Sequence, residues 1–382
     1  MGFWDHLTGQ DDAIRSLRAA ASTAPGNRAM SHSWLITGPP GSGRSNLAYA
    51  FAAALLSRGP ADEDATLAQV HARSHPDLAV LSTDRVIIKI DEVRELVRNS
   101  QYSPSVGRYR VVVVEDADRM TEQTSNVLLK ALEEPPSSTV WILCAPSEAD
   151  LIPTIRSRVR SVRLRVPAPA DVATLLRERD GIDAGTALLA AREAQSHIGM
   201  ARRLATDPEA RARRRQTLDT VLSIRSVSDA VVAAGVLLAV AGDDAKAFTA
   251  ERDEQERESA LRSLGVAPGG TIPPALRSQM RTLEEDQKRR ATRSLRDGID
   301  RILVDLLSLY RDILLLQLGG VDEPINDSIR PRLDQAAQSS TAASTLRVLD
   351  AVQTARERVD RNVAALLALE AMLIAVSRHS TR

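Results

Sequence analysis

Gly38-Pro39-Pro40-Gly41-Ser42-Gly43-Arg44-Ser45 is the stretch that decides the fold of this chain of 382 residues. It follows a short apolar run, 34–37, and precedes an alanine-rich run, 46–56. A strand, a glycine-rich loop and a helix in this order and spacing are typical of a P-loop, whose backbone N–H groups hold phosphates. The stretch therefore predicts a nucleotide-binding loop. Its candidate ligand-binding residues are Gly38, Gly41, Gly43, Arg44 and Ser45.

Arg44 stands where a P-loop usually has lysine. A lysine presents a compact charge to the β- and γ-phosphates, whereas the guanidinium of arginine is planar, forked and bulkier. The exchange is not conservative at a crowded phosphate site. We therefore expect the loop's fold to be kept, and ATP and Mg²⁺ to bind weakly or not at all.

Four valines, 111–114, precede Glu115 and Asp116. In P-loop ATPases a strand of this kind delivers one carboxylate to Mg²⁺ and a second to the attacking water. The usual order is aspartate then glutamate, and here it is inverted. A misplacement near 1 Å can lower a rate by about 10²-fold. The pair is a candidate nucleotide site with doubtful catalytic geometry, and the alternative that two acids merely end a strand stays open.

Composition narrows the class of protein. The chain is long enough for two or three domains. Its 50 basic and 50 acidic residues give a net charge of zero, so the overall charge does not indicate a nucleic-acid-binding protein. The basic run 211–215 is interpreted as a solvated helix face. A single cysteine, Cys144, excludes an internal disulfide framework. The N-terminus lacks a signal-peptide pattern, and no apolar run approaches the roughly 20 residues that span a bilayer, so we expect a cytoplasmic protein without membrane contact.

The pattern along the chain predicts an α/β region followed by an all-α region. Helices are predicted at 91–99, with Asp91 as the N-cap, and at 123–133. The charged stretch 246–262 favours a helix, and a loop is predicted over 265–274. Strands are expected at 33–37, 77–81, 110–114, 140–144 and 161–166. These features predict a P-loop α/β domain over 1–166, a helical lid over 167–215 and a helical oligomerisation domain over 216–382.

Several longer segments resemble a known family. Asn126–Pro136 reads NVLLKALEEPP, residues 151–158 read LIPTIRSR, and 90–96 read IDEVREL. With His75-Pro76-Asp77, they make residues 1 to about 215 similar to the AAA+ module of bacterial clamp-loader subunits, most closely the delta-prime family of DNA polymerase III. The resemblance is looser beyond that point, where it rests on Tyr310-Arg311-Asp312 and Gln317-Leu318-Gly319.

The resemblance implies roles for two arginines. Arg158 would be an arginine finger that reaches the γ-phosphate of ATP held by a neighbouring subunit. Arg202 would be a sensor arginine near this chain's own nucleotide pocket. The alternatives, that Arg158 is a surface arginine in a salt bridge and that Arg202 is a solvated charge, stay open.

Two departures from the ATP-hydrolysing relatives bear on chemistry. Their four zinc-binding cysteines would fall at about 57–74, where this chain has none, so zinc is not expected. Their polar residue after the fourth strand is replaced by the apolar sequence Leu143-Cys144-Ala145-Pro146.

Together these features favour a non-hydrolysing stator subunit over an ATP-hydrolysing motor subunit of the gamma/tau type. A small-molecule kinase is a weaker third hypothesis. By resemblance, the chain would belong to the DNA polymerase III holoenzyme without polymerase activity and with little or no ATPase activity. It would join gamma/tau and delta subunits in a hetero-pentamer that acts on the sliding clamp and meets primed DNA mostly indirectly.

Overall fold

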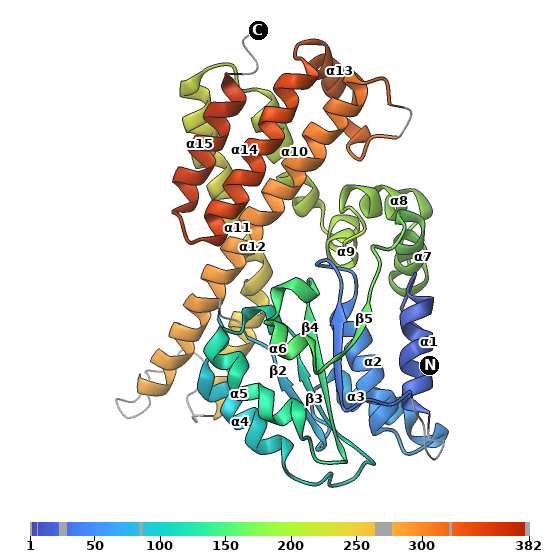
Figure 1. The fold of residues 1–382 in the computed structure, drawn as a ribbon. Helices are drawn as coiled ribbons and strands as arrows, with labels where there is room; N and C mark the ends of the chain where they lie inside the picture. Colours follow the sequence, from blue (N-terminus) through green and yellow to red (C-terminus); the bar gives the residue numbers. More distant parts are fainter. Residues whose placement is uncertain are drawn as a thin grey trace. The chain divides into compact units, whose positions relative to one another are not determined.

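A computed structural model describes residues 2–5, 7–22, 29–83, 87–263, 277–320 and 323–378 (Figure 1). The chain divides into two compact units, Met1–Ala205 and Thr206–Arg382. The loop predicted over 265–274 lies outside the described residues.

The first unit is built on a parallel sheet of five strands in the order β2-β3-β4-β1-β5. The expected α/β fold is confirmed. The strands predicted at 33–37 and 110–114 begin and end at the residues observed in the structure. The strand expected at 161–166 ends three residues early, because the chain leaves the sheet ahead of Pro167. The strands are β1 (Ser33–Thr37), β2 (Leu78–Leu81), β3 (Arg110–Val114), β4 (Thr139–Ala145) and β5 (Arg160–Arg163).

Successive residues of each strand point to opposite faces of the sheet and belong to two separate hydrophobic cores. Trp34, Ile36 and Val113 pack under α1 (Asp11–Ala21), α2 (Arg44–Leu56) and α3 (Glu63–His71). On the other face Leu35, Val112 and Trp141 pack under α4, α5 and α6. The central strands β1 and β4 are buried on both faces, as expected of a covered parallel sheet. The second set of helices is α4 (Ile90–Ser100), α5 (Glu122–Glu133) and α6 (Pro153–Arg156).

The prediction that Asp91 caps α4 is wrong. The helix begins one residue earlier, at Ile90, and the carboxylate of Glu92 accepts a hydrogen bond from the Lys89 backbone N–H at 3.0 Å. Asp91 lies in the first turn, where it pairs with Arg94 at 3.2 Å. Its charge still suits the positive end of the helix, but the residue after it performs the capping.

Asp77 fixes the loop that leads into β3. Its side chain is fully buried and accepts backbone hydrogen bonds from Ser105 (2.5 Å), Val106 (2.7 Å) and Gly107 (2.7 Å). Burial alone would raise its pKa, but these three donors favour the carboxylate, and the pKa of Asp77 is lowered. The aspartate therefore anchors the turn that delivers the strand carrying Glu115.

Three short helices complete the first unit after Pro167: α7 (Pro169–Asp180), α8 (Ala184–Glu193) and α9 (Ile198–Thr206). Residues 167–205 of the predicted lid thus belong to the same compact unit as the sheet, and 206–215 belong to the second unit. The predicted boundary at residue 215 falls inside a helix, α10 (Pro208–Leu222), which begins the second unit. The three-domain division itself stays a prediction.

The second unit is helical, as expected. Its two longest helices, α11 (Val227–Ser263) and α12 (Arg277–Gln317), run antiparallel, with Arg290 bonded to Asp253 (2.5 Å) and Glu256 (3.0 Å). The helix favoured for 246–262 is thus confirmed as part of α11. The remaining helices are α13 (Arg330–Gln338), α14 (Ala342–Asp360) and α15 (Ala365–Ser377).

One arginine of the run 211–215 does not lie on a solvated face, which corrects that interpretation. Arg214 is buried, and its guanidinium donates to Asp305 (2.9 Å) and Asn326 (2.5 Å). Asn326 in turn donates through its side chain to Asp312 at 2.8 Å. A charge is stable at this position because partners from two other segments satisfy it.

Candidate nucleotide site and arginine finger

The glycine loop adopts a backbone conformation that depends on its glycines. Gly41 and Gly43 have φ angles of +77° and +91°, in the left-handed region that favours glycine. Gly43 precedes the first residue of α2, so the loop ends at the positive end of that helix. Ser45 is the second residue of α2 and is half-buried. The cradle for a phosphate is therefore kept in its backbone.

The lid lies against this loop. The Ile198 N–H donates to the Gly41 carbonyl at 3.1 Å, and a Cβ at Gly41 would come within 2.1–2.4 Å of the His197 ring. Gly38 is also crowded, though less so, since a Cβ there would lie 2.7 Å from the Ser42 hydroxyl oxygen. His197 was not predicted as a site residue. Its only signal in the sequence is its place five residues before Arg202.

Arg44 turns back onto its own loop. Its Nη1 donates to the Gly38 carbonyl at 2.8 Å, across the loop that it follows. The guanidinium thus holds the two ends of the P-loop together.

Glu115 lies at the carboxyl end of β3, where its Oε1 already has two donors. The Tyr49 hydroxyl donates at 2.5 Å and Arg73 Nη2 at 3.0 Å. Tyr49 comes from α2, and burial, followed by its bond to Glu115, raises its pKa, so it stays a protonated donor. Sequence reasoning missed both partners, because they are far from Glu115 in the chain and belong to no motif.

Asp116 follows Glu115 and leads into a 3-10 turn, Ala117–Arg119. Its Oδ2 lies 3.8 Å from Arg119 Nε. Arg73 and Arg119 therefore each place a positive charge of this chain beside an acid at the end of β3. A magnesium ion needs carboxylate oxygens in octahedral geometry, and Glu115 Oε1, which already accepts from two donors, is not open to one. This oxygen does not fit the metal that the fold implies.

Cys144 lies near the end of β4, within the apolar segment 143–146 that stands where a polar residue is expected by resemblance. It is fully buried, and burial raises the pKa of its thiol to about 12. The Gly38 N–H donates to the carbonyl of Pro146, two residues further on, at 3.2 Å. The end of β4 thus supports the loop through its backbone.

Arg158 lies between α6 and β5, with its side chain one-third exposed. Its Nε donates to Glu133 at 2.6 Å, and its Nη1 donates to the Thr154 carbonyl at 2.8 Å and to the Ser157 hydroxyl at 3.0 Å. The guanidinium is thus fixed from the side of its own chain, while part of it faces solvent. This geometry is compatible with a finger held in place and with a local salt bridge.

Arg202, on α9, pairs with Asp180 at 3.1 Å, and its side chain is 60% exposed. The sensor role implied for it stays a prediction, since the parts of the lid that contact the loop are His197 and Ile198.

Across the residues that the structure describes, no three His, Cys, Asp or Glu side chains gather into a metal site. Nor does any helix among them have the length and apolar character of a membrane span.

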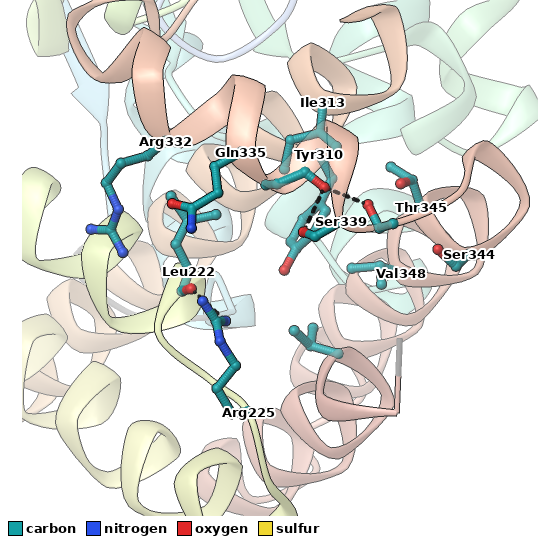
Figure 2. Close-up of a pocket in the computed structure, with 13 residues that line it drawn as sticks. Leu222, Arg225, Tyr310, Ile313, Arg332, Gln335, Ser339, Ser344, Thr345 and Val348 are labelled. Atoms are coloured by element: carbon teal, nitrogen blue, oxygen red, sulfur yellow. Dashed lines mark hydrogen bonds between the residues drawn. The ribbon is translucent and has the colours of Figure 1, made fainter. Parts of the chain in front are cut away.

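The second unit contains a cavity of about 250 Å³ (Figure 2). Its polar wall is largely used within the chain: Ser339 and Ser340 donate to the Ala336 carbonyl, and Arg225 donates to the Leu222 carbonyl. It is lined from α12, α13 and α14 as well as by the end of α10. These groups serve the fold, and no reactive pair among them indicates chemistry.

The first unit is similar in sequence to known proteins. Residues 9–168 match the family model described as "DNA polymerase III, delta subunit". The DNA polymerase III subunit delta' of Pseudomonas aeruginosa is 37% identical over 158 residues, 39% of this chain and 48% of that protein, so the match spans about half the relative's length. The subunit delta' of Bacillus subtilis is 24% identical over 87% of each chain. The gamma/tau subunit of Mycobacterium tuberculosis is 30% identical over 46% of this chain and 31% of that protein.

These matches confirm the expected resemblance to the delta-prime subunits of the DNA polymerase III clamp loader. The chain is thus similar to clamp-loader subunits of both the delta-prime and the gamma/tau type.

Proposed function

We propose that this chain is the delta-prime, or stator, subunit of a DNA polymerase III clamp loader. It would support ATP-dependent loading of the sliding clamp onto primed DNA in the cytoplasm, in a hetero-pentamer with gamma/tau and delta subunits. In that assembly Arg158 would contact ATP bound by a neighbouring subunit, and this chain's own pocket would hydrolyse little or no ATP.

One observation carries the non-hydrolysing part of the proposal. The Arg44 guanidinium donates to the Gly38 carbonyl of its own loop at 2.8 Å, so the cation expected on the phosphates is bonded to the backbone. The contact of His197 and Ile198 with Gly41 adds to this, because an incoming phosphate would meet the lid at the loop.

The geometry of Arg158 supports action on a neighbour. A finger in trans must be exposed enough to reach another subunit and restrained enough to arrive in one orientation. Arg158 is one-third exposed and is restrained by Glu133, Thr154 and Ser157. All three of its guanidinium nitrogens have partners within the chain, so Arg158 would exchange part of these contacts for a phosphate oxygen when a neighbouring subunit docks.

A motor subunit of the gamma/tau type is the second candidate, favoured by the 30% identity to the Mycobacterium tuberculosis protein and by the intact glycines. The site argues against it. A motor needs a free cation at position 44 and a free acid at the end of β3, and Arg44 and Glu115 are both engaged within the chain.

The experiment is a comparison of Arg158→Ala and Arg44→Ala in a clamp loader reconstituted with gamma/tau and delta subunits. The proposal expects clamp- and DNA-stimulated ATP hydrolysis to fall at least tenfold with Arg158→Ala and to stay near wild type with Arg44→Ala. Circular dichroism of each variant checks that the fold is intact. The reverse pattern would assign the chain to the motor type.

A further inference from the structure

We infer that Arg73 takes the place of a bound cation at the acidic end of β3, so that Glu115 fastens the connection between α3 and β2 instead of binding Mg²⁺. The inference deepens the non-hydrolysing part of the proposed function and rests on it only for the expectation that this pocket does not turn over ATP. It does not depend on what Arg158 does.

The contacts converge on a single oxygen. Glu115 Oε1 accepts from the Tyr49 hydroxyl at 2.5 Å and from Arg73 Nη2 at 3.0 Å. The carboxylate is 16% exposed and Tyr49 is buried, so water competes weakly for the tyrosine bond, whereas the Arg73 side chain is 48% exposed and its ion pair is partly screened. Hydrogen bonds to an ionised partner in such a setting are among the stronger ones in proteins.

The path of the chain brings Arg73 to this point. Arg73 follows the last turn of α3, and its φ is +55°. Residues other than glycine rarely adopt this left-handed backbone conformation. Its backbone N–H bonds the Val70 carbonyl at 3.0 Å, and its Nη1 donates to the Ser82 hydroxyl just beyond β2 at 3.0 Å. The strained turn is thus held by one contact of the Arg73 backbone and one of its guanidinium.

The guanidinium also lies over the Tyr49 ring, with its central carbon 5.8 Å from the ring centre. One arginine therefore connects α2, the α3–β2 connection and the end of β3.

The same contacts disfavour a divalent cation. Mg²⁺ requires carboxylate oxygens at about 2.0–2.1 Å and gives up its water reluctantly. A guanidinium 3.0 Å from Glu115 Oε1 would repel such an ion and would lose its own partner if the carboxylate turned away. The acid is thus committed to a fixed internal charge.

This assignment changes the expected effect of replacing Glu115 on stability from stabilising to destabilising. Carboxylates poised for a metal repel their neighbours, and their removal commonly stabilises a protein at the expense of function. Here Glu115→Gln would remove an ion pair and weaken the bond from a buried tyrosine hydroxyl. The substitution is therefore expected to destabilise the first unit.

The test is thermal unfolding of the full chain, followed by tryptophan fluorescence, for Glu115→Gln and for the milder Tyr49→Phe. Glu95→Gln, the same exchange at an exposed position of α4, is the matched control. All three tryptophans, at positions 4, 34 and 141, belong to the first unit, so the signal reports that unit. In parallel, Mn²⁺ is titrated as the probe by electron paramagnetic resonance.

We expect Glu115→Gln to lower the midpoint temperature by roughly 2–6 °C, Tyr49→Phe to lower it by less, and the Glu95 control to leave it within about 1 °C. Mn²⁺ binding to the wild-type chain should equal that to Glu115→Gln. Two results would overturn the inference: a midpoint that rises or does not move with Glu115→Gln, or Mn²⁺ binding by the wild type that this substitution abolishes. ATP turnover plays no part in these readouts, so the inference and the proposed function can fail separately.

Discussion

Replacement of Asp77 by asparagine should destabilise the first unit strongly, although it changes only one oxygen into an amide. The side chain is fully buried. Its Oδ1 accepts from Ser105, while Oδ2 accepts from both Val106 and Gly107. An asparagine keeps one oxygen and must point its amide nitrogen, a donor, at one of these N–H groups.

The magnitude follows from that geometry. At least one charge-assisted hydrogen bond is lost, worth about 1.5–3 kcal/mol, and a buried N–H is left without an acceptor at about 1–3 kcal/mol. We therefore expect the free energy of unfolding to fall by about 3–5 kcal/mol. For a unit of about 200 residues, this corresponds to a decrease of roughly 6–20 °C in the midpoint temperature.

The pH dependence gives a second check. The pKa of Asp77 is lowered in the folded state, from an ordinary value of 3.8. Its contribution is then fully present above pH 3.8 and is lost as the pH falls through the lower, folded-state pKa. The difference between wild type and Asp77→Asn should thus shrink in strong acid.

The assay is tryptophan-monitored unfolding of both proteins at pH 7, 5 and 3 and in stronger acid. A midpoint for the asparagine variant within 1 °C of wild type at pH 7 would refute the reasoning. A large difference that does not shrink in strong acid would show that the carboxylate charge is not its source.

Three further substitutions or modifications test other parts of the site. Glu133→Gln should loosen Arg158 and lower the turnover of a reconstituted clamp loader by about 3–10-fold, less than Arg158→Ala does; an unchanged rate would show that Glu133 does not position the arginine. Gly41→Ala forces a side chain onto a φ of +77° and into the His197 ring, so it should lower the stability of the first unit by about 1–3 kcal/mol in denaturant titrations, and a neutral result would contradict the contact between lid and loop. Cys144 is buried with a raised pKa, so a thiol reagent at pH 8 should label it only in denaturant, and rapid labelling of the native protein would contradict its burial.

The sequence was most informative where a local pattern has one structural solution. The spacing of the P-loop predicts a strand before the glycines and a helix after them, and the structure has β1 and α2 there. The valine run predicts β3 to the residue, because a strand buried on both faces reads as a continuous apolar segment.

Prediction was weaker where position depends on distant partners. The bonds from Tyr49 and Arg73 to Glu115 join residues 66 and 42 positions apart, and no periodicity in the sequence relates them. The interpretation of Arg214 as solvated was wrong for the same reason, since its partner Asp305 is 91 positions away. Charged residues reveal whether they are buried only when the fold brings their counterions together.

The site residues differ in how directly the structure bears on them. Arg44 and Glu115 have contacts that explain why this pocket would be inactive. The contacts of Arg158 are within the chain, so its action on a neighbour depends on an assembly of several subunits. Sequence resemblance is the basis for expecting that assembly.

The most direct test of the stator proposal is therefore the ATP hydrolysis rate of the reconstituted clamp loader, with clamp and primed DNA present, for Arg158→Ala beside Arg44→Ala. The proposal predicts a loss of at least tenfold with Arg158→Ala and a rate near wild type with Arg44→Ala. A loss with Arg44→Ala in a folded protein, together with an unchanged rate for Arg158→Ala, would contradict it and show that this chain's own pocket is the one that works.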